Sequence, residues 1–206
     1  MAQVFPTKAN LLNTKKSLEL AKLGYDLMDR KRNILVREMM SLIDEAKEVQ
    51  QQIGEAYAAA YNALKTASLN LGDCSRFAGA IPVDDSVTVD YRSVMGVEVP
   101  TVEIGDRKTD VRDFGFLATN SDFDEACLRF GEVKQLTVHL AQIESSVYRL
   151  ADAVKKTQKR SNALNNIMIP RLSETVKFIT EALDEKERED FSRLKVTKRF
   201  KEKKDE

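Results

Sequence analysis

The sequence predicts a mostly α-helical protein: a long antiparallel two-helix coiled coil with a small β-hairpin insert between the helices. The first observation is the distribution of glycine and proline, the poorest helix formers. Five of the eight glycines and two of the four prolines lie between residues 72 and 115. The other observations are a heptad repeat on both sides of that segment and a two-residue alternation within it. We divide the chain into an N-terminal coiled-coil helix (1–71), an insert with the hairpin (72–121) and a C-terminal coiled-coil helix with a basic tail (122–206).

The N-terminal helix is predicted by two rows of residues spaced seven apart, a period that favours a left-handed coiled coil. The rows are apolar or aromatic except at Thr14, Arg32 and Asn70. Arg32 either extends from an exposed part of the seam or sets the register against a carboxylate on the partner helix. The first row is Leu11, Leu18, Tyr25, Arg32, Met39, Ala46, Ile53, Ala60 and Ala67, and the second is Thr14, Ala21, Met28, Leu35, Leu42, Val49, Ala56, Ala63 and Asn70.

The C-terminal helix repeats the pattern in steps of three and four residues, with Ser161 as a weak position. The seam residues are Val133, Leu136, Leu140, Ile143, Val147, Leu150, Val154, Thr157 and Leu164. Intervals of four then follow at Met168, Leu172 and Val176, which predict local unwinding, before the seam resumes at Ile179 and Leu183. Pro170 lacks a backbone donor and predicts a kink, which is either merely tolerated or a built-in bend.

The insert has the two-residue period that is typical of β-strands. The alternating apolar residues are Val87, Val89 and Tyr91, then Val97 and Val99, then Val102 and Ile104, with Gly96, Pro100 and Gly105 as punctuation. We expect a β-hairpin or a small meander here. Two long helices joined through such an insert pair most simply as antiparallel neighbours.

Composition excludes several classes of function. The chain has 33 basic and 33 acidic side chains and no net charge, which argues against the broad positive field of a nucleic-acid-binding protein. The longest stretch without a charge runs from Ser161 to Pro170, whereas a membrane-spanning helix needs about 20 apolar residues. The N-terminus lacks the layout of a secretory signal. We therefore expect a cytoplasmic protein with no direct membrane insertion, held at a membrane only through partners.

The sequence offers no catalytic centre. Cys74 and Cys127 are too far apart in sequence for a metal knuckle or a redox pair and are interpreted as free thiols. His139 is the single histidine and follows the heptad pattern as a flank position, and no phosphate-binding loop is present. We expect no enzyme activity, no cofactor and no metal. The basic tail, with Arg193, Lys195, Lys198 and Arg199, is either a disordered solubilising end or a basic finger for an acidic partner surface.

Several ordered motifs, among them Pro6-Thr7-Lys8, Met95-Gly96-Val97 and Ile169-Pro170, resemble the D subunit of the V-type and A-type rotary ATPases. At the start these are Pro6-Thr7-Lys8, Leu11-Leu12, Lys15, Leu18, Ala21, Gly24 and Lys31-Arg32. The insert contributes Met95-Gly96-Val97 and Pro100, and the C-terminal half contributes residues 159–164, Ile169-Pro170, Glu187-Arg188-Glu189 and Leu194-Lys195. Ser161 departs from the family, which usually has a larger apolar residue there.

The resemblance implies a non-catalytic central rotor shaft that couples ATP hydrolysis or synthesis to H⁺ or Na⁺ translocation. Its paired terminal helices would enter a hexameric head of catalytic A and regulatory B subunits. The F subunit would bind the side of the shaft, and the C subunit (called d in eukaryotes) would link it to the membrane rotor ring. The family's hairpin has been linked to stimulation of hydrolysis, which we transfer to 94–104.

Three sets of residues follow from this interpretation. The expected head contact comprises Pro6, Thr7, Lys8, Arg193, Lys195, Lys198 and Arg199. The hairpin set is Met95, Gly96, Val97 and Pro100, and the shaft kink is assigned to Asn162, Leu164, Ile169 and Pro170. The alternative is a free-standing coiled-coil scaffold that dimerises through the same seams. The sequence leaves the transported ion and the direction of the reaction open.

Overall fold

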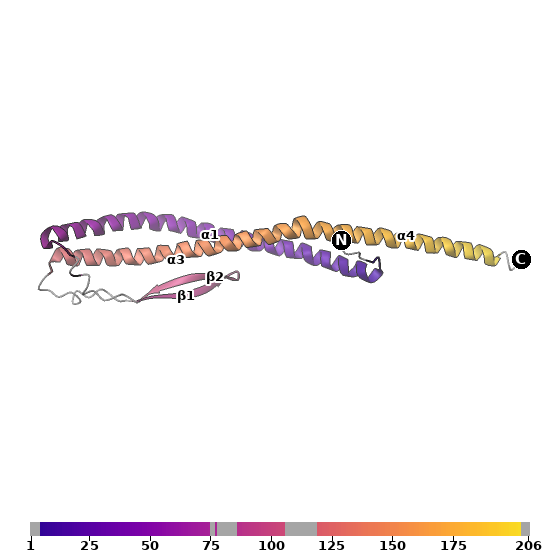
Figure 1. Cartoon of the computed structure of the whole chain (residues 1–206), viewed down its shortest axis with the longest axis horizontal. Helices are drawn as coiled ribbons and strands as arrows, with labels where there is room; N and C mark the ends of the chain where they lie inside the picture. The colour runs from indigo at the N-terminus through magenta and orange to yellow at the C-terminus, as the bar shows by residue number, and fades with distance from the viewer. Residues whose placement is uncertain (1–4, 75–76, 78–85, 106–118, 203–206) are drawn as a thin grey trace. The chain divides into compact units, whose positions relative to one another are not determined.

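The computed structural model describes residues 5–74, 77, 86–105 and 119–202. Its elements follow in the order α1 (Lys8–Leu71), β1 (Val87–Val94), β2 (Val97–Ile104), α3 (Ser121–Ala163), η2 (Leu164–Met168) and α4 (Ile169–Glu202), as Figure 1 shows. The prediction of a mostly α-helical chain with two long helical segments and a small hairpin is confirmed. In the described part of the chain, none of the helices is long and apolar enough to cross a membrane.

The heptad rows are confirmed along α1. Every residue of the two predicted rows except Asn70 is buried or half-buried, whereas Leu12, Leu20, Leu23 and Leu27, which lie between the rows, are exposed. The helix ends where Gly72, at φ 76°, donates its N–H to the carbonyl of Ser68 at 3.0 Å. A glycine in the left-handed region is the usual way to close a helix.

The chain groups into two compact units, one of residues 33–155 and one of residues 1–32 with 156–206. Each unit therefore combines an earlier and a later stretch of helix from the chain. The division of the sequence into segments 1–71, 72–121 and 122–206 remains a prediction.

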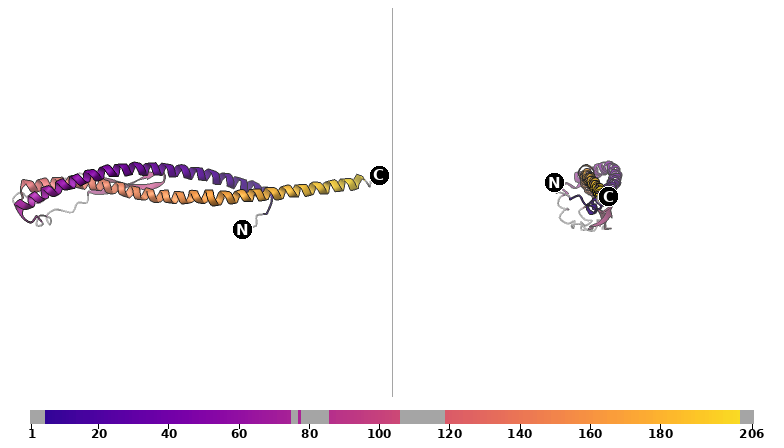
Figure 2. Two further views of the ribbon diagram at one scale, coloured as in Figure 1. Left: turned by 90° about the horizontal axis from the view of Figure 1, so that it is seen from above. Right: turned by 90° about the vertical axis from the view of Figure 1, so that its right-hand side faces the viewer.

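In the unit of residues 33–155, α1 and α3 run antiparallel (Figures 1 and 2). Leu35 packs with Leu150 at one end of the pair, and Ala67 packs with Phe123 at the other. Between them the rings of Tyr61 and Phe130 meet edge to face with centroids 5.6 Å apart. Between the two clusters the seam also buries Val49, Val133 and Ile143, so the apolar core follows the length of the helix pair.

The hairpin packs against the first of these clusters. β1 and β2 pair antiparallel from Val87 opposite Ile104 to Val94 opposite Val97, and the turn residues Met95 and Gly96 have φ angles of 50° and 76°. Val99 is buried beside Leu35 and Leu150. The expectation that Pro100 separates two strand runs is wrong, because β2 continues through it. A proline is tolerated there because its nitrogen points to the outer edge of the hairpin, where it removes no bond between the strands.

In the other unit, the first part of α1 pairs antiparallel with η2, α4 and the end of α3. Arg32 bonds Gln158, a Cβ built on Gly24 would meet the Leu164 side chain at 3.9 Å, and Lys8 reaches Glu187. Residues far apart in sequence thus approach in reverse order, as the predicted antiparallel pairing requires. Figure 2 shows that within this unit α4 continues past the start of α1.

The seam of this unit contains a π-helical turn, η2, in which Ile169 donates its N–H to the carbonyl of Leu164. Met168 was predicted as a seam residue, but it is exposed, and Ile169 is half-buried in its place. The seam then continues through Leu172, Val176, Ile179 and Leu183. The expected intervals of four are therefore wrong at Met168: the π turn absorbs one extra residue, and the later seam keeps steps of three and four.

Candidate interaction surfaces

The end of α4 is the most exposed helical segment in the described chain. From Asp184 to Lys201 every described side chain is exposed. Lys8, the first residue of α1, pairs with Glu187 of α4. Four large apolar side chains lie on this segment between 51% and 70% exposed: Phe191, Leu194, Val196 and Phe200. Apolar groups in such number on an unpaired helix are typical of a surface that a partner covers.

The basic residues predicted for head contact lie on the same segment. Arg193 pairs with Glu189 at 3.5 Å and with Asp190 at 4.0 Å, both on its own helix. Lys195, Lys198 and Arg199 are exposed. Because α4 is helical to Glu202, the interpretation of the tail as a disordered end is wrong for the described residues. These charges were predicted from the sequence, whereas the apolar residues on the same segment were not. Their signal in the sequence is that they lie beyond Leu183, the last residue of the predicted seam.

The N-terminal motif builds the start of α1. The Thr7 hydroxyl accepts the N–H of Asn10 at 3.2 Å and its carbonyl accepts the N–H of Leu11 at 2.9 Å, so Thr7 caps the helix. Lys8 Nζ lies 2.9 Å from Glu187 Oε1. This hydrogen bond is the main reason why the pKa of Lys8 is raised and that of Glu187 is lowered. Pro6 is exposed beside them. The structure therefore places Lys8 in contact with α4 at Glu187, and Pro6 and Thr7 directly precede it in the chain.

A polar network lies just before η2. Arg32 Nη2 pairs with Asp29 at 2.6 Å, Arg32 Nη1 donates to Gln158 Oε1 at 2.8 Å, and Gln158 Nε2 donates to Asn162 Oδ1 at 2.7 Å. Arg32 therefore contacts the partner helix, although through an amide, while its carboxylate partner belongs to α1. Of the predicted kink residues, Leu164 and Ile169 are half-buried at the two ends of the π turn, whereas Asn162 and Pro170 are exposed.

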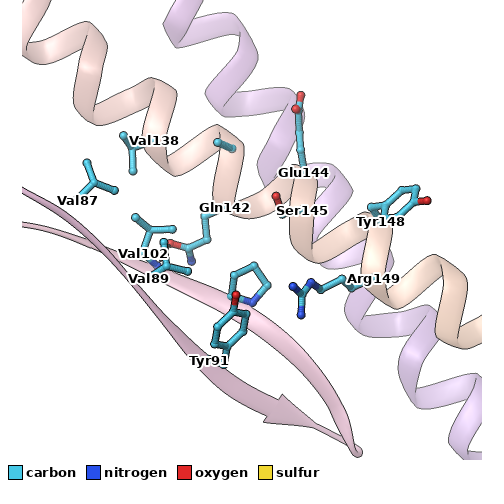
Figure 3. A pocket seen from close by; sticks show the side chains of 12 residues that line it. Val87, Val89, Tyr91, Val102, Val138, Gln142, Glu144, Ser145, Tyr148 and Arg149 are labelled. Carbon is cyan, nitrogen blue, oxygen red and sulfur yellow. Dashed lines mark hydrogen bonds between the residues drawn. The ribbon is translucent and has the colours of Figure 1, made fainter. Parts of the chain in front are cut away.

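The hairpin is held to both helices of its unit. Arg92 approaches Glu38 on α1 at 3.6 Å, and Lys134 on α3 donates to Ser86 at 3.2 Å. Arg149 on α3 lies 5.1 Å from the Tyr91 ring centroid, within the range of a cation–π contact. A groove of about 640 Å³ lies between one face of the hairpin and α3, and Figure 3 shows the side chains that line it. Of the predicted hairpin residues, Met95 and Gly96 form the turn, Val97 packs on the core and Pro100 lines the groove.

The two cysteines come closer in space than their separation in sequence suggests. Cys74 and Cys127 both pack against the cluster of Ala67, Phe77 and Phe123, and both are free thiols. Burial is the main reason why the pKa of the Cys127 thiol is raised. Among the described residues, no group of three histidine, cysteine, aspartate or glutamate side chains is placed to hold a metal ion.

Comparison with known proteins identifies one family. The family model for the D subunit of ATP synthase matches residues 10–199. The V-type ATP synthase D subunit of Thermotoga neapolitana is 43% identical over 197 residues, which cover 95% of this chain and 97% of that protein. The A-type ATP synthase D subunits of Pyrococcus furiosus and Thermococcus kodakarensis are each 38% identical, over 95% and 96% of this chain and 94% of their own lengths.

Proposed function

Because this chain belongs to the family of ATP synthase D subunits from V-type and A-type complexes, we propose that it is the non-catalytic central rotor shaft of such a complex. In this role it couples ATP hydrolysis or synthesis in a head of A and B subunits to the translocation of H⁺ or Na⁺. It would act beside the membrane, without entering it.

The observation that best supports this function is the exposed end of α4. A shaft that turns inside a head needs a segment that the head surrounds, and this segment presents apolar side chains and cations on a helix that α1 does not cover. The residues proposed for head contact are Pro6, Thr7 and Lys8 at the start of α1, with Arg193, Lys195, Lys198 and Arg199 on α4. Removal of apolar surface from water is the main driving force for such a contact, and the cations direct it.

A rotor must also be asymmetric. Chemically identical catalytic interfaces take different conformations only if the shaft makes different contacts with each, because a differential interaction is what shifts a conformational equilibrium. The segment of Asn162, Leu164, Ile169 and Pro170, which contains the π turn, interrupts the regular helix. We assign the asymmetry of the shaft to this interruption.

The remaining contacts follow from the role of the family. The F subunit binds the side of the shaft, and the C subunit, called d in eukaryotes, connects it to the membrane ring. The hairpin, with Met95, Gly96, Val97 and Pro100, stimulates hydrolysis in the head.

The test is reconstitution with a purified A/B head. We expect the intact chain to bind the head and to change its rate of ATP turnover, while the chain alone hydrolyses no ATP. Replacement of Phe191 and Leu194 by serine should weaken binding by about tenfold or more, because about 1.4 kcal/mol of lost apolar burial corresponds to that factor. The matched control replaces Leu20 and Leu23 on α1, whose side chains are 68% and 56% exposed, by serine. Equal effects of both pairs, or no binding by the intact chain, would contradict the assignment of this segment.

A further inference from the structure

The hairpin protects one of its two edges and leaves the other open. On β2, the N–H of Val102 donates to Gln142 Oε1 at 3.0 Å, and the carbonyl of Glu98 accepts a bond from Arg149 Nη1 at 3.3 Å. Between them stands Pro100, which has no N–H to offer. The outer edge of β2 therefore faces α3 and presents no continuous row of backbone groups to another chain.

The outer edge of β1 is different. The register pairs Val89 with Val102 and Tyr91 with Pro100, so residues 87, 89, 91 and 93 direct their N–H and carbonyl groups away from β2. Within the described residues these groups have no hydrogen-bond partner. This edge carries the charged residues Asp90 and Arg92, but no lysine, proline or bulge, which are among the devices that protect an edge strand from pairing with another chain.

One face beside this edge is apolar. Val87, Val89 and Tyr91 lie along it, and they line the groove together with Val138 and Tyr148 of α3 (Figure 3). Tyr91 is 59% exposed and Tyr148 is 79% exposed. A strand that added to β1 would place every second side chain over this groove, because side chains alternate between the faces of a sheet.

The opposite face of the hairpin packs on the helices near the turn, through Val94, Val97 and Val99, and it carries acidic residues farther from the turn. Arg92 is paired with Glu38 on α1, whereas the carboxylates of Asp90 and Glu103 have no cation partner among the described residues. Both belong to strand positions that face away from the groove. A complementary strand would therefore carry lysine or arginine at the positions between its apolar residues.

We propose that β1 is a docking edge to which an extended segment of another subunit of the complex adds as a third strand. The segment has apolar residues at alternate positions over the groove and a basic residue beside Asp90. Main-chain bonds along the edge supply affinity, and the alternating side chains supply selectivity, as in other cases of strand addition. This inference rests on membership in a multi-subunit complex, and it does not depend on rotation.

Hydrogen exchange tests the pairing directly. In the assembled complex, the outward amides of Val87, Val89, Tyr91 and Ser93 should exchange at least about tenfold more slowly than in the free chain, because a backbone hydrogen bond must open before exchange. The inward amides of Thr88, Asp90 and Arg92, already bonded to β2, provide the internal reference. Unchanged exchange at the outward amides would overturn the proposal. Protection of the same amides in the free chain at high concentration would instead identify a second copy as the occupant, which also overturns it.

Substitutions distinguish an added strand from a partner that covers β1 without forming main-chain hydrogen bonds to it. Val89→Pro removes an outward N–H and blocks an added strand, but it leaves the bonds to β2 intact, as Pro100 does on the other strand. In competition with the unmodified chain for assembly, we expect Val89→Pro to lose by about tenfold and Val89→Thr, which keeps the N–H, to compete nearly equally. Slow exchange of the inward amides in the free variant verifies that the hairpin is formed.

A second pair of variants tests the charge. Asp90→Lys should be excluded from the complex more strongly than Asp90→Asn, and the difference should shrink at high salt, because screening weakens exposed ion pairs.

Equal competition by Val89→Pro and Val89→Thr would overturn the strand-addition model even if the outward amides were protected. If the chain failed to change ATP turnover in the A/B head, protection of the outward amides would still support strand addition, since the exchange experiment requires assembly but no ATP turnover.

Discussion

The hairpin turn depends on two residues with positive φ angles, Met95 at 50° and Gly96 at 76°. A two-residue turn with both angles positive matches the twist of an antiparallel pair. Glycine adopts this conformation freely, whereas the same conformation costs a residue with a Cβ about 1–2 kcal/mol. The turn therefore depends on Gly96 and tolerates Met95 at a cost.

Substitutions at these neighbours should act in opposite directions. Gly96→Ala should destabilise the hairpin by about 1 kcal/mol, which makes exchange of the amides of Asp90 and Arg92 about fivefold faster. Met95→Asn should slow the same exchange, because asparagine accepts positive φ more readily than methionine. The measurement is residue-resolved hydrogen exchange on the free chain. Acceleration by both variants would mean that the turn has a different conformation.

The Cys127 thiol should be slow to alkylate. Its pKa is raised, first by burial and then by Asp124 and Cys74, and the thiolate is the reactive form. At a given pH a raised pKa lowers the thiolate fraction, so the curve of alkylation rate against pH should shift to higher pH than for a short peptide containing cysteine. Mass spectrometry of the peptide that contains Cys127 measures the rate, and the chain in urea is the control. A folded chain that reacts as fast as the unfolded one would contradict this.

At the scale of the elements, η2 is the place where the helix adapts both to an irregular heptad spacing and to Pro170. Eight residues separate Leu164 from Leu172 in the seam, one more than two steps of three and four allow, and the π turn from Leu164 to Met168 takes up the difference. Pro170 follows directly, where it has no N–H to give to the carbonyl of Asn166, four residues earlier. The irregularity thus belongs to the spacing of the seam as much as to the proline.

Pro170→Ala tests whether this irregularity serves the rotor. The alanine restores one helical donor, so we expect a gain in stability of about 0.5–1.5 kcal/mol, measured by thermal unfolding. If the segment is the source of asymmetry, ATP-driven ion translocation by the reconstituted complex should fall. Arg171→Ala, at the exposed neighbouring position, is the control and should change neither quantity much. Unchanged coupling in Pro170→Ala would exclude Pro170 as the source.

At the scale of the whole molecule, the seams are already occupied within one chain. Leu35, Leu150 and Ile179 are fully buried, and Ile143 is nearly so. A scaffold that dimerised through these seams would have to expose them first. The apolar residues that stay exposed include those on the end of α4, on the outer face of α1 and beside the hairpin groove.

The free chain should therefore be a monomer. Light scattering of the purified protein should give a mass near 23.3 kDa, with no increase as the concentration rises to about that used for assembly. The physical reason is that self-association through the seams would first have to break the apolar contacts that the seam residues make within one chain. A stable species of twice this mass would favour the scaffold interpretation.

Much of the fold could be predicted because it rests on local periodicity. The rows that contain Leu35 and Leu150 specify the helices and their buried faces, and these predictions are confirmed. The alternation through Val87 and Val102 specifies the strands, which are also confirmed, but Val87, Val89 and Tyr91 are exposed, so it does not specify a buried face. The motifs from Pro6 to Leu194 indicated the family, which the comparisons confirm. The roles of the head-contact, hairpin and kink residues remain predictions.

Only the tertiary structure decided the features that depend on contacts between residues far apart in the sequence. Pro100 sits inside β2 because the register turns its nitrogen outward, and Met168 leaves the seam because the later seam must keep its phase against α1. Likewise, Gln142 and Arg149 cap one edge of the hairpin while β1 stays open, which no pattern in either segment alone reveals. A repeat determines which face of an element is apolar, but which backbone groups find partners depends on elements that only folding brings together.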